Sequence, residues 1–100
     1  MPLTITVTGS DVALTGEIDI QTAPSLRAEL TELINATVTG EELRVDLAEV
    51  TLVDSSGLSV LIAAHKLATV QEVRLLLTAL PHHVSRTLSI TGLDEILEIA

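Results

Sequence analysis

Apolar residues and threonines alternate over residues 3–8, a spacing of two that is typical of a strand with one buried face. The turn-forming residues Gly9-Ser10-Asp11 follow, and residues 12–15 have the pattern of a second strand. We therefore predict that the chain begins with a β-hairpin. Gly16-Glu17-Ile18-Asp19 leads out of the second strand.

The next segment has the spacing of an amphipathic helix. Thr22 suits the cap position, and Pro24 suits the first turn, where its missing N–H costs no hydrogen bond. Four aliphatic residues then share one stripe, whereas the charged residues lie elsewhere on the helix: Leu26, Leu30, Leu33 and Ile34. The helical pattern fades near residues 37–40.

Two strands and a second helix are predicted in the middle of the chain. Residues 43–47 alternate as a third strand, and residues 50–53 lead to the turn Asp54-Ser55-Ser56-Gly57. Residues 58–69 form an apolar helix, and residues 73–77 form a fourth strand.

A third helix begins at Pro81 and ends at Gly92, with Val84 and Leu88 on its inner side. Residues 93–99 hold a short helical turn, a last strand, or both. Strands that are linked by helices indicate right-handed crossovers and parallel pairing in part of the sheet. We expect a mixed sheet with helices on one face and solvent on the other.

The second helix is apolar nearly all round. One side carries Leu58, Leu61, Ile62 and Ala68, and much of the opposite side carries Val60, Ala63, Ala64 and Leu67. Such a helix either is buried on all sides within its own domain or has an apolar face that a partner protein covers. The second group is therefore either a protein-docking surface or a face that flanking helices cover.

Composition excludes several classes of partner. The chain has no Phe, Trp or Tyr to stack on bases, and its net charge of −9 opposes binding to nucleic acid or to an anionic membrane. Its longest nearly apolar stretch, residues 58–64, is too short to insert into a bilayer, and no signal peptide is visible. We expect a cytoplasmic protein.

Enzymatic chemistry has little support in the sequence. There is no Cys, and the three histidines, His65, His82 and His83, have no spacing typical of a metal site. Neither a Gly-x-Ser-x-Gly motif around Ser56 nor a Gly-rich loop with a phosphate-binding Lys is present. We predict a non-enzymatic protein that has no cofactor.

The turn Asp54-Ser55-Ser56-Gly57 carries the candidate chemistry. Ser55 or Ser56 can cap the following helix, or one of them can receive a phosphate that free N–H groups at the helix end help to hold. Asp54 can instead close an Asx-turn, and Gly57 either lets a partner backbone come close or relaxes the turn.

In this order, the motifs resemble STAS domains (sulphate transporter and anti-sigma factor antagonist), most closely the free-standing bacterial anti-sigma factor antagonists. The resemblance rests on motifs along the whole chain: Gly16-Glu17-Ile18-Asp19, Val45-Asp46-Leu47, Val53-Asp54-Ser55-Ser56-Gly57-Leu58, and, near the end, Val84, Leu88 and Thr91-Gly92-Leu93. It implies an α/β, STAS-like single domain over residues 1–100. The implied sheet is mixed and four- to five-stranded, with helices packed mainly on one face.

The resemblance also implies a phosphorylation cycle. In that family the second serine of the motif, here Ser56, is phosphorylated by an anti-sigma factor that is also a serine kinase. The unphosphorylated antagonist binds this kinase and releases a sigma factor, and a serine phosphatase reverses the modification. Ser55 and Gly57 would support the switch, and Asp19 and Asp54 would repel the added phosphate.

Two departures from the family pattern affect the expected partner. Ser59 stands where the family often has Gly, and residues 69–72 replace a Gly-rich turn. The alternative function is a STAS subunit of another assembly, such as a lipid-transport ATPase complex or a stress-signalling complex, in which the same turn and helix serve for docking.

Overall fold

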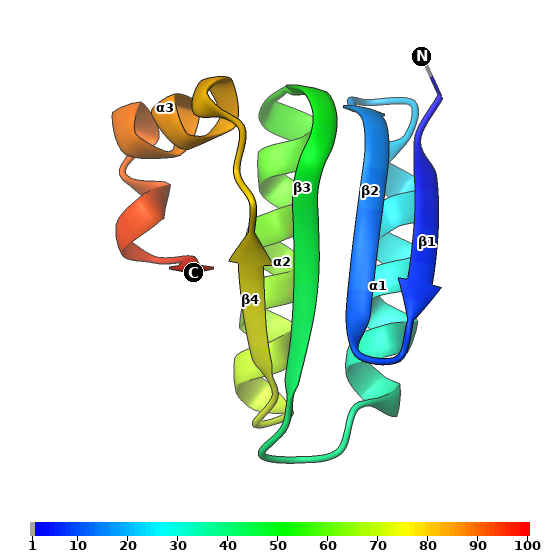
Figure 1. Cartoon of the computed structure of the whole chain (residues 1–100). Helices are drawn as coiled ribbons and strands as arrows, with labels where there is room; N and C mark the ends of the chain where they lie inside the picture. The colour runs from blue at the N-terminus through cyan, green and yellow to red at the C-terminus, as the bar shows by residue number, and fades with distance from the viewer. Residues whose placement is uncertain (1) are drawn as a thin grey trace.

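The computed structural model describes residues 2–100 and contains one mixed sheet with helices against it (Figure 1). In chain order the elements are β1 (Thr4–Thr8), β2 (Asp11–Ile18), α1 (Ala23–Ala36), β3 (Glu42–Val53), α2 (Ser55–Val70), β4 (Arg74–Thr78), α3 (His82–Thr91), the 3-10 turn η1 (Leu93–Glu95) and β5 (Glu98–Ile99). The strands lie in the order β1-β2-β3-β4-β5.

The sheet contains the predicted hairpin and parallel crossovers. β1 and β2 pair antiparallel, with Ile5 opposite Leu14. The pairs β2–β3, β3–β4 and β4–β5 are parallel, and Ile18 lies opposite Val53 where β2 and β3 end. Helix-linked parallel pairing was predicted from the alternation of strands and helices, and it is confirmed.

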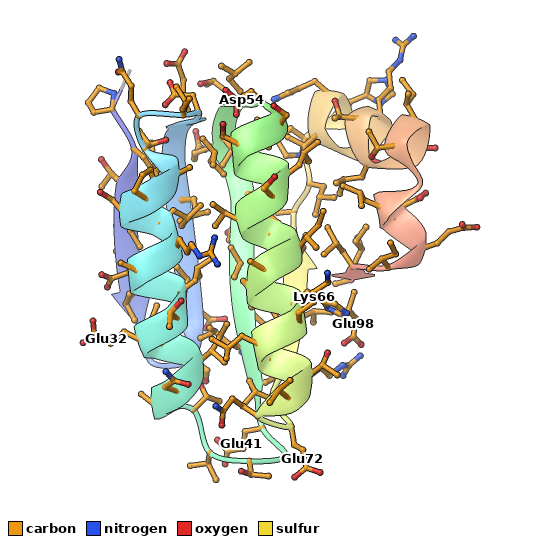
Figure 2. The ribbon with its side chains drawn as sticks, turned by 180° about the vertical axis from the view of Figure 1, so that it is seen from behind. Glu32, Glu41, Asp54, Lys66, Glu72 and Glu98 are labelled. Carbon is orange, nitrogen blue, oxygen red and sulfur yellow. The ribbon has the colours of Figure 1, made fainter. Side chains whose placement is uncertain are left out.

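Two helices cover one face of the sheet. Figures 1 and 2 show α1 and α2 side by side on this face, both running from the end where β2 and β3 finish toward the opposite end. α1 buries Ala23, Leu26, Leu30 and Ile34, close to the predicted stripe. On the other face of the sheet, Ala13, Thr15 and Arg44 are exposed, as expected for a sheet that is solvated on one side.

The core between the sheet and the helices is aliphatic. Its fully buried residues come from both layers, and within residues 2–100 no polar or charged residue is buried. Each fully buried Leu or Ile contributes roughly 1.5–3 kcal/mol relative to an exposed side chain. The largest of these are Leu14, Ile18, Leu26, Leu30, Ile34, Leu47, Leu61, Leu77 and Leu88.

Several boundaries differ from the prediction. β2 runs to Ile18, three residues beyond the predicted end at Thr15. β3 is one strand of 12 residues, whereas a strand and a separate lead-in segment were predicted. A register shift against β2 leaves two neighbouring residues, Ala48 and Glu49, both exposed. This break in alternation hides the continuity of the strand. α2 begins at Ser55, three residues before the predicted Leu58, and β4 runs one residue later than predicted.

The C-terminal part follows the predicted signals. Pro81 precedes α3 and Gly92 ends it, while Val84 and Leu88 are buried. The last residues hold both a helical turn, η1, and a short strand, β5. Of the helices in residues 2–100, none combines the length and the apolarity that a bilayer crossing requires.

Candidate functional site

The motif that ends at Asp19 and the motif that begins at Asp54 meet at one edge of the sheet, where β2 and β3 end. Ile18 and Val53 are register partners at the ends of parallel strands, so Asp19 and Asp54 both follow at the same edge. The backbone N–H of Asp54 donates to the carbonyl oxygen of Ile18 at 3.1 Å, which ties the two turns together. Figure 2 shows Asp54 at the N-terminal end of α2.

Asp54, not a serine, caps α2. Its Oδ1 accepts hydrogen bonds from the N–H of Ser56 at 2.9 Å and of Gly57 at 3.1 Å. Asp54 has extended backbone angles, and its carbonyl accepts from Leu58 N–H at 2.9 Å. Of the alternatives that the sequence left open for this turn, a cap by Ser55 or Ser56 is not found, because the residue before them satisfies the first free amides.

This cap also corrects the expected environment of a phosphate. The N–H groups of Ser56 and Gly57 were expected to be free to receive it, but both already donate to the Asp54 carboxylate. A phosphate on Ser56 would meet a carboxylate at the helix end, and its favourable partners must come from elsewhere.

Ser55 and Ser56 have different surroundings. Ser55 is exposed, and its carbonyl accepts a hydrogen bond from the hydroxyl of Ser59 at 2.9 Å, one turn further along α2. Ser56 is half-buried and lines an open hollow between α1 and α2.

Gly57 serves an internal contact. It is buried, and a Cβ added to it would lie 2.8 Å from the carbonyl oxygen of Ile18 and 2.9 Å from Cγ1 of Val53. Both distances are far below van der Waals contact. The close approach that requires glycine is therefore made by β2 and β3 of this chain, which is neither of the two reasons that the sequence suggested.

Asp19 holds the turn that leads into α1. Its Oδ1 accepts from the N–H groups of Thr22 at 3.0 Å and Gln21 at 2.9 Å. These hydrogen bonds hold the pKa of the Asp19 carboxyl below its usual value, and the bond from the Thr22 N–H has the largest effect. Thr22 occupies the predicted cap position, but its hydroxyl donates to the carbonyl of Glu17 at 2.8 Å and does not cap the helix.

An open groove runs between α1 and α2. Its first hollow, about 390 Å³, is lined by Ile20, Ala23, Pro24, Arg27, Ser56, Ser59 and Val60. A second hollow of about 330 Å³ is lined by Arg27, Thr31, Val60, Ala63, Ala64 and Leu67. Because Arg27 and Val60 line both hollows, we treat them as one feature, the α1–α2 groove.

The predicted docking face of α2 is largely covered by α1. Val60 and Ala64 are only 5% and 7% exposed, so for these two residues the alternative of a covered face holds and that of a docking surface does not. Ala63 and Leu67 are half-buried, and Ser59 is exposed. The face therefore remains accessible only as the floor and wall of the α1–α2 groove.

The predicted site left out five residues that line the groove: Ile20, Ala23, Pro24, Arg27 and Thr31. Ile20 is 74% exposed, although it is a large aliphatic side chain. The sequence feature that could have indicated Ile20 is its position in a turn between two polar residues, Asp19 and Gln21. Arg27 gave no signal, because only the packing of α1 beside α2 brings it to the groove.

No metal centre is found in the part of the chain that the structure describes. Within residues 2–100, no three His, Asp or Glu side chains are grouped so as to hold an ion. His82 and His83 lie exposed in the first turn of α3.

Comparison with known proteins identifies the family. The family described as "Mlab, STAS domain" matches residues 3–98, and the chain belongs to the STAS domain family. A curated relative, the anti-sigma-B factor antagonist of Listeria monocytogenes, is 38% identical over 89 residues, which cover 89% of this chain and 76% of the relative.

Solved structures share the fold. An anti-sigma factor antagonist from Mycobacterium paratuberculosis superposes with a TM-score of 0.79 at 24% identity, covering 97% of this chain and 82% of that one. The phosphorylated form of the Bacillus cell fate determinant SpoIIAA superposes with a TM-score of 0.69 at 20% identity, covering 98% of this chain and 90% of that one.

Proposed function

We propose that this chain is an anti-sigma factor antagonist that is regulated at Ser56. In this proposal the unphosphorylated protein binds an anti-sigma factor that is also a serine kinase, and the bound kinase releases its sigma factor. The observation that carries the proposal is the position of Ser56 on an open groove with an exposed apolar side chain, Ile20. The antagonist from Listeria supports the assignment.

The partner binds along the α1–α2 groove. Ile20 and Leu67 offer apolar surface toward its two ends, and Ser56 lies in its first hollow. The remaining contacts on α2 come from Ser59 and Ala63, which also line the groove and are not buried. The net charge of −9 favours a partner with a basic surface.

Phosphorylation changes the charge of this surface. The Ser56 hydroxyl attacks the γ-phosphorus of ATP that is bound to the kinase, yielding phosphoserine, ADP and a proton. The product carries about −1.5 to −2 charges at neutral pH, next to the Asp54 carboxylate that caps the same helix turn. A partner that fits a neutral hydroxyl would lose roughly two decades of affinity, or about 2.7 kcal/mol.

The switch needs no rearrangement of the fold. Ser56 lies at an accessible site, and its turn is fixed by Asp54 and by the packing of Gly57 on Ile18. The protein acts by binding and not by catalysis. A serine phosphatase returns the phosphorylated form to the binding-competent one.

A pull-down from lysate, read by mass spectrometry, tests the proposed function. The baits are wild-type protein, Ser56→Ala and Ser56→Asp, and the matched controls are Ser55→Ala and Ser55→Asp. We expect wild-type, Ser56→Ala and both Ser55 variants to retain an ATP-binding, kinase-like protein, whereas Ser56→Asp loses it. Retention of the same partners by every bait, or of transport-ATPase subunits instead, would overturn the proposal.

A further inference from the structure

The backbone amides in the first turn of α2 are already engaged. Ser56 and Gly57 donate their N–H groups to Asp54, so the helix terminus has no free pair of donors for the phosphate at this position. The hydroxyl of Ser59, the other polar group on this side, donates to the carbonyl of Ser55. A dianion here needs a cation from another element.

Among residues 2–100, Arg27 is the one cation that lines the groove. It lies in the second turn of α1 and is exposed, and within residues 2–100 no carboxylate forms an ion pair with it. Arg44 and Arg74 are paired with carboxylates at the opposite rim of the sheet. Figure 2 shows Lys66 well along α2 from Asp54.

The direction of the helices brings Arg27 toward the site. α1 and α2 run the same way, with their N-termini at the same edge of the sheet (Figure 2). Side chains on a helix lean in general toward its N-terminus, which is the direction from Arg27 to the first turn of α2. Arg27 and Ser56 line the same hollow.

We propose that Arg27 is the intramolecular receptor for the phosphate on Ser56. The guanidinium donates hydrogen bonds to the phosphate oxygens across the α1–α2 groove and offsets the repulsion from Asp54 and Asp19. The bridge fills the mouth of the groove and occupies the cation that the described residues place there. Phosphorylation thereby closes the docking surface as well as charging it. This inference rests on Ser56 being the phosphorylated residue.

A phosphorus NMR titration of the phosphate tests the contact without any partner protein. Phosphoserine is placed at position 56 by genetic encoding, in wild-type protein and in Arg27→Gln, Arg27→Lys and Arg86→Gln. Arg86→Gln is the matched control, because this exposed arginine lies on α3 and does not line the groove. Circular dichroism of each protein establishes that its helices are intact.

We expect the second pKa of the phosphate, ordinarily about 6, to rise by at least about half a unit in Arg27→Gln. Arg27→Lys should restore part of the difference, and Arg86→Gln should match wild type. Equal phosphate pKa values in wild type and Arg27→Gln would overturn the inference. Because the phosphate is installed without a kinase, this result is independent of whether the pull-down identifies one.

Discussion

Gly57 and Ile18 are in direct backbone contact, and this contact joins the two motifs of the site. A Cβ at Gly57 would lie 2.7 Å from Cγ2 and 2.8 Å from the carbonyl oxygen of Ile18. The first turn of α2 can therefore sit against the end of β2 only with glycine at this position. The same contact sets the position of Ser56 relative to the turn that carries Asp19.

Replacement of Gly57 by Ala should destabilise the protein. Alanine favours a helix by about 1 kcal/mol over glycine, but the clash with a backbone oxygen forces α2 away from the sheet at a cost of about 1–3 kcal/mol. We expect a net loss of stability in urea unfolding. Ser59→Ala, an exposed change in the same helix, is the control and should stay within about 0.5 kcal/mol of wild type. A Gly57→Ala protein as stable as wild type would contradict the packing argument.

The cap of α2 predicts a graded effect at Asp54. Asp54→Ala leaves the N–H groups of Ser56 and Gly57 without their acceptor and should cost about 1 kcal/mol. Asp54→Asn keeps a side-chain oxygen for the cap, and we expect it to lose less. Thermal unfolding of the three proteins measures the order, and an Asn variant less stable than the Ala variant would be evidence against capping.

The lowered pKa of Asp19 predicts a contribution to stability that depends on pH. Because the folded pKa lies below the unfolded value of about 3.9, the ionised carboxylate stabilises the fold above that value. This contribution disappears as the pH falls through the folded pKa. Urea unfolding between pH 7 and pH 2.5 should therefore show the gap between wild type and Asp19→Asn closing below about pH 4.

A direct NMR titration gives the corresponding check on Asp19. Its carboxyl carbon should titrate below the ordinary aspartate range. Asp11 also has a lowered pKa, because Arg44 donates a hydrogen bond to its carboxylate. Since Asp11 is present in wild type and in Asp19→Asn alike, its contribution cancels when the stabilities of these two proteins are compared. An Asp19 that titrates at or above its ordinary value would show that the turn does not stabilise the carboxylate.

Ile20 predicts where the partner binds. Ile20→Ser removes a large apolar side chain from the rim of the groove and should weaken binding to the anti-sigma factor about tenfold, or 1.4 kcal/mol. Ile90→Ser on α3 is a close match, because Ile90 is 75% exposed and Ile20 is 74% exposed. Calorimetric titration of both variants separates a site-specific effect from a general loss of surface hydrophobicity, which would weaken both equally.

The sequence was most informative where local signals were unambiguous. Alternation predicted the hairpin, the stripe from Leu26 to Ile34 predicted the buried face of α1, and Pro81 and Gly92 marked α3. In each case the local pattern and the tertiary packing favour the same structure. The order of strands and helices was then sufficient to predict the one-sided sheet.

The details of the site were less predictable because neighbouring residues offered the same local chemistry. Asp54, Ser55 and Ser56 are all good cap residues, and only the packing of the turn against Ile18 selects Asp54. The apolar surface of α2 did not reveal how closely α1 would cover Val60. Arg27 becomes a candidate only when the two helices are placed side by side.

The central claim is that phosphate on Ser56 switches off binding to the anti-sigma factor. The most direct measurement is the affinity of the purified partner for the unphosphorylated protein and for the form carrying phosphoserine at position 56. We expect the phosphorylated form to bind at least about 100-fold more weakly, a difference of about 2.7 kcal/mol. Equal affinity of the two forms would contradict the proposed switch.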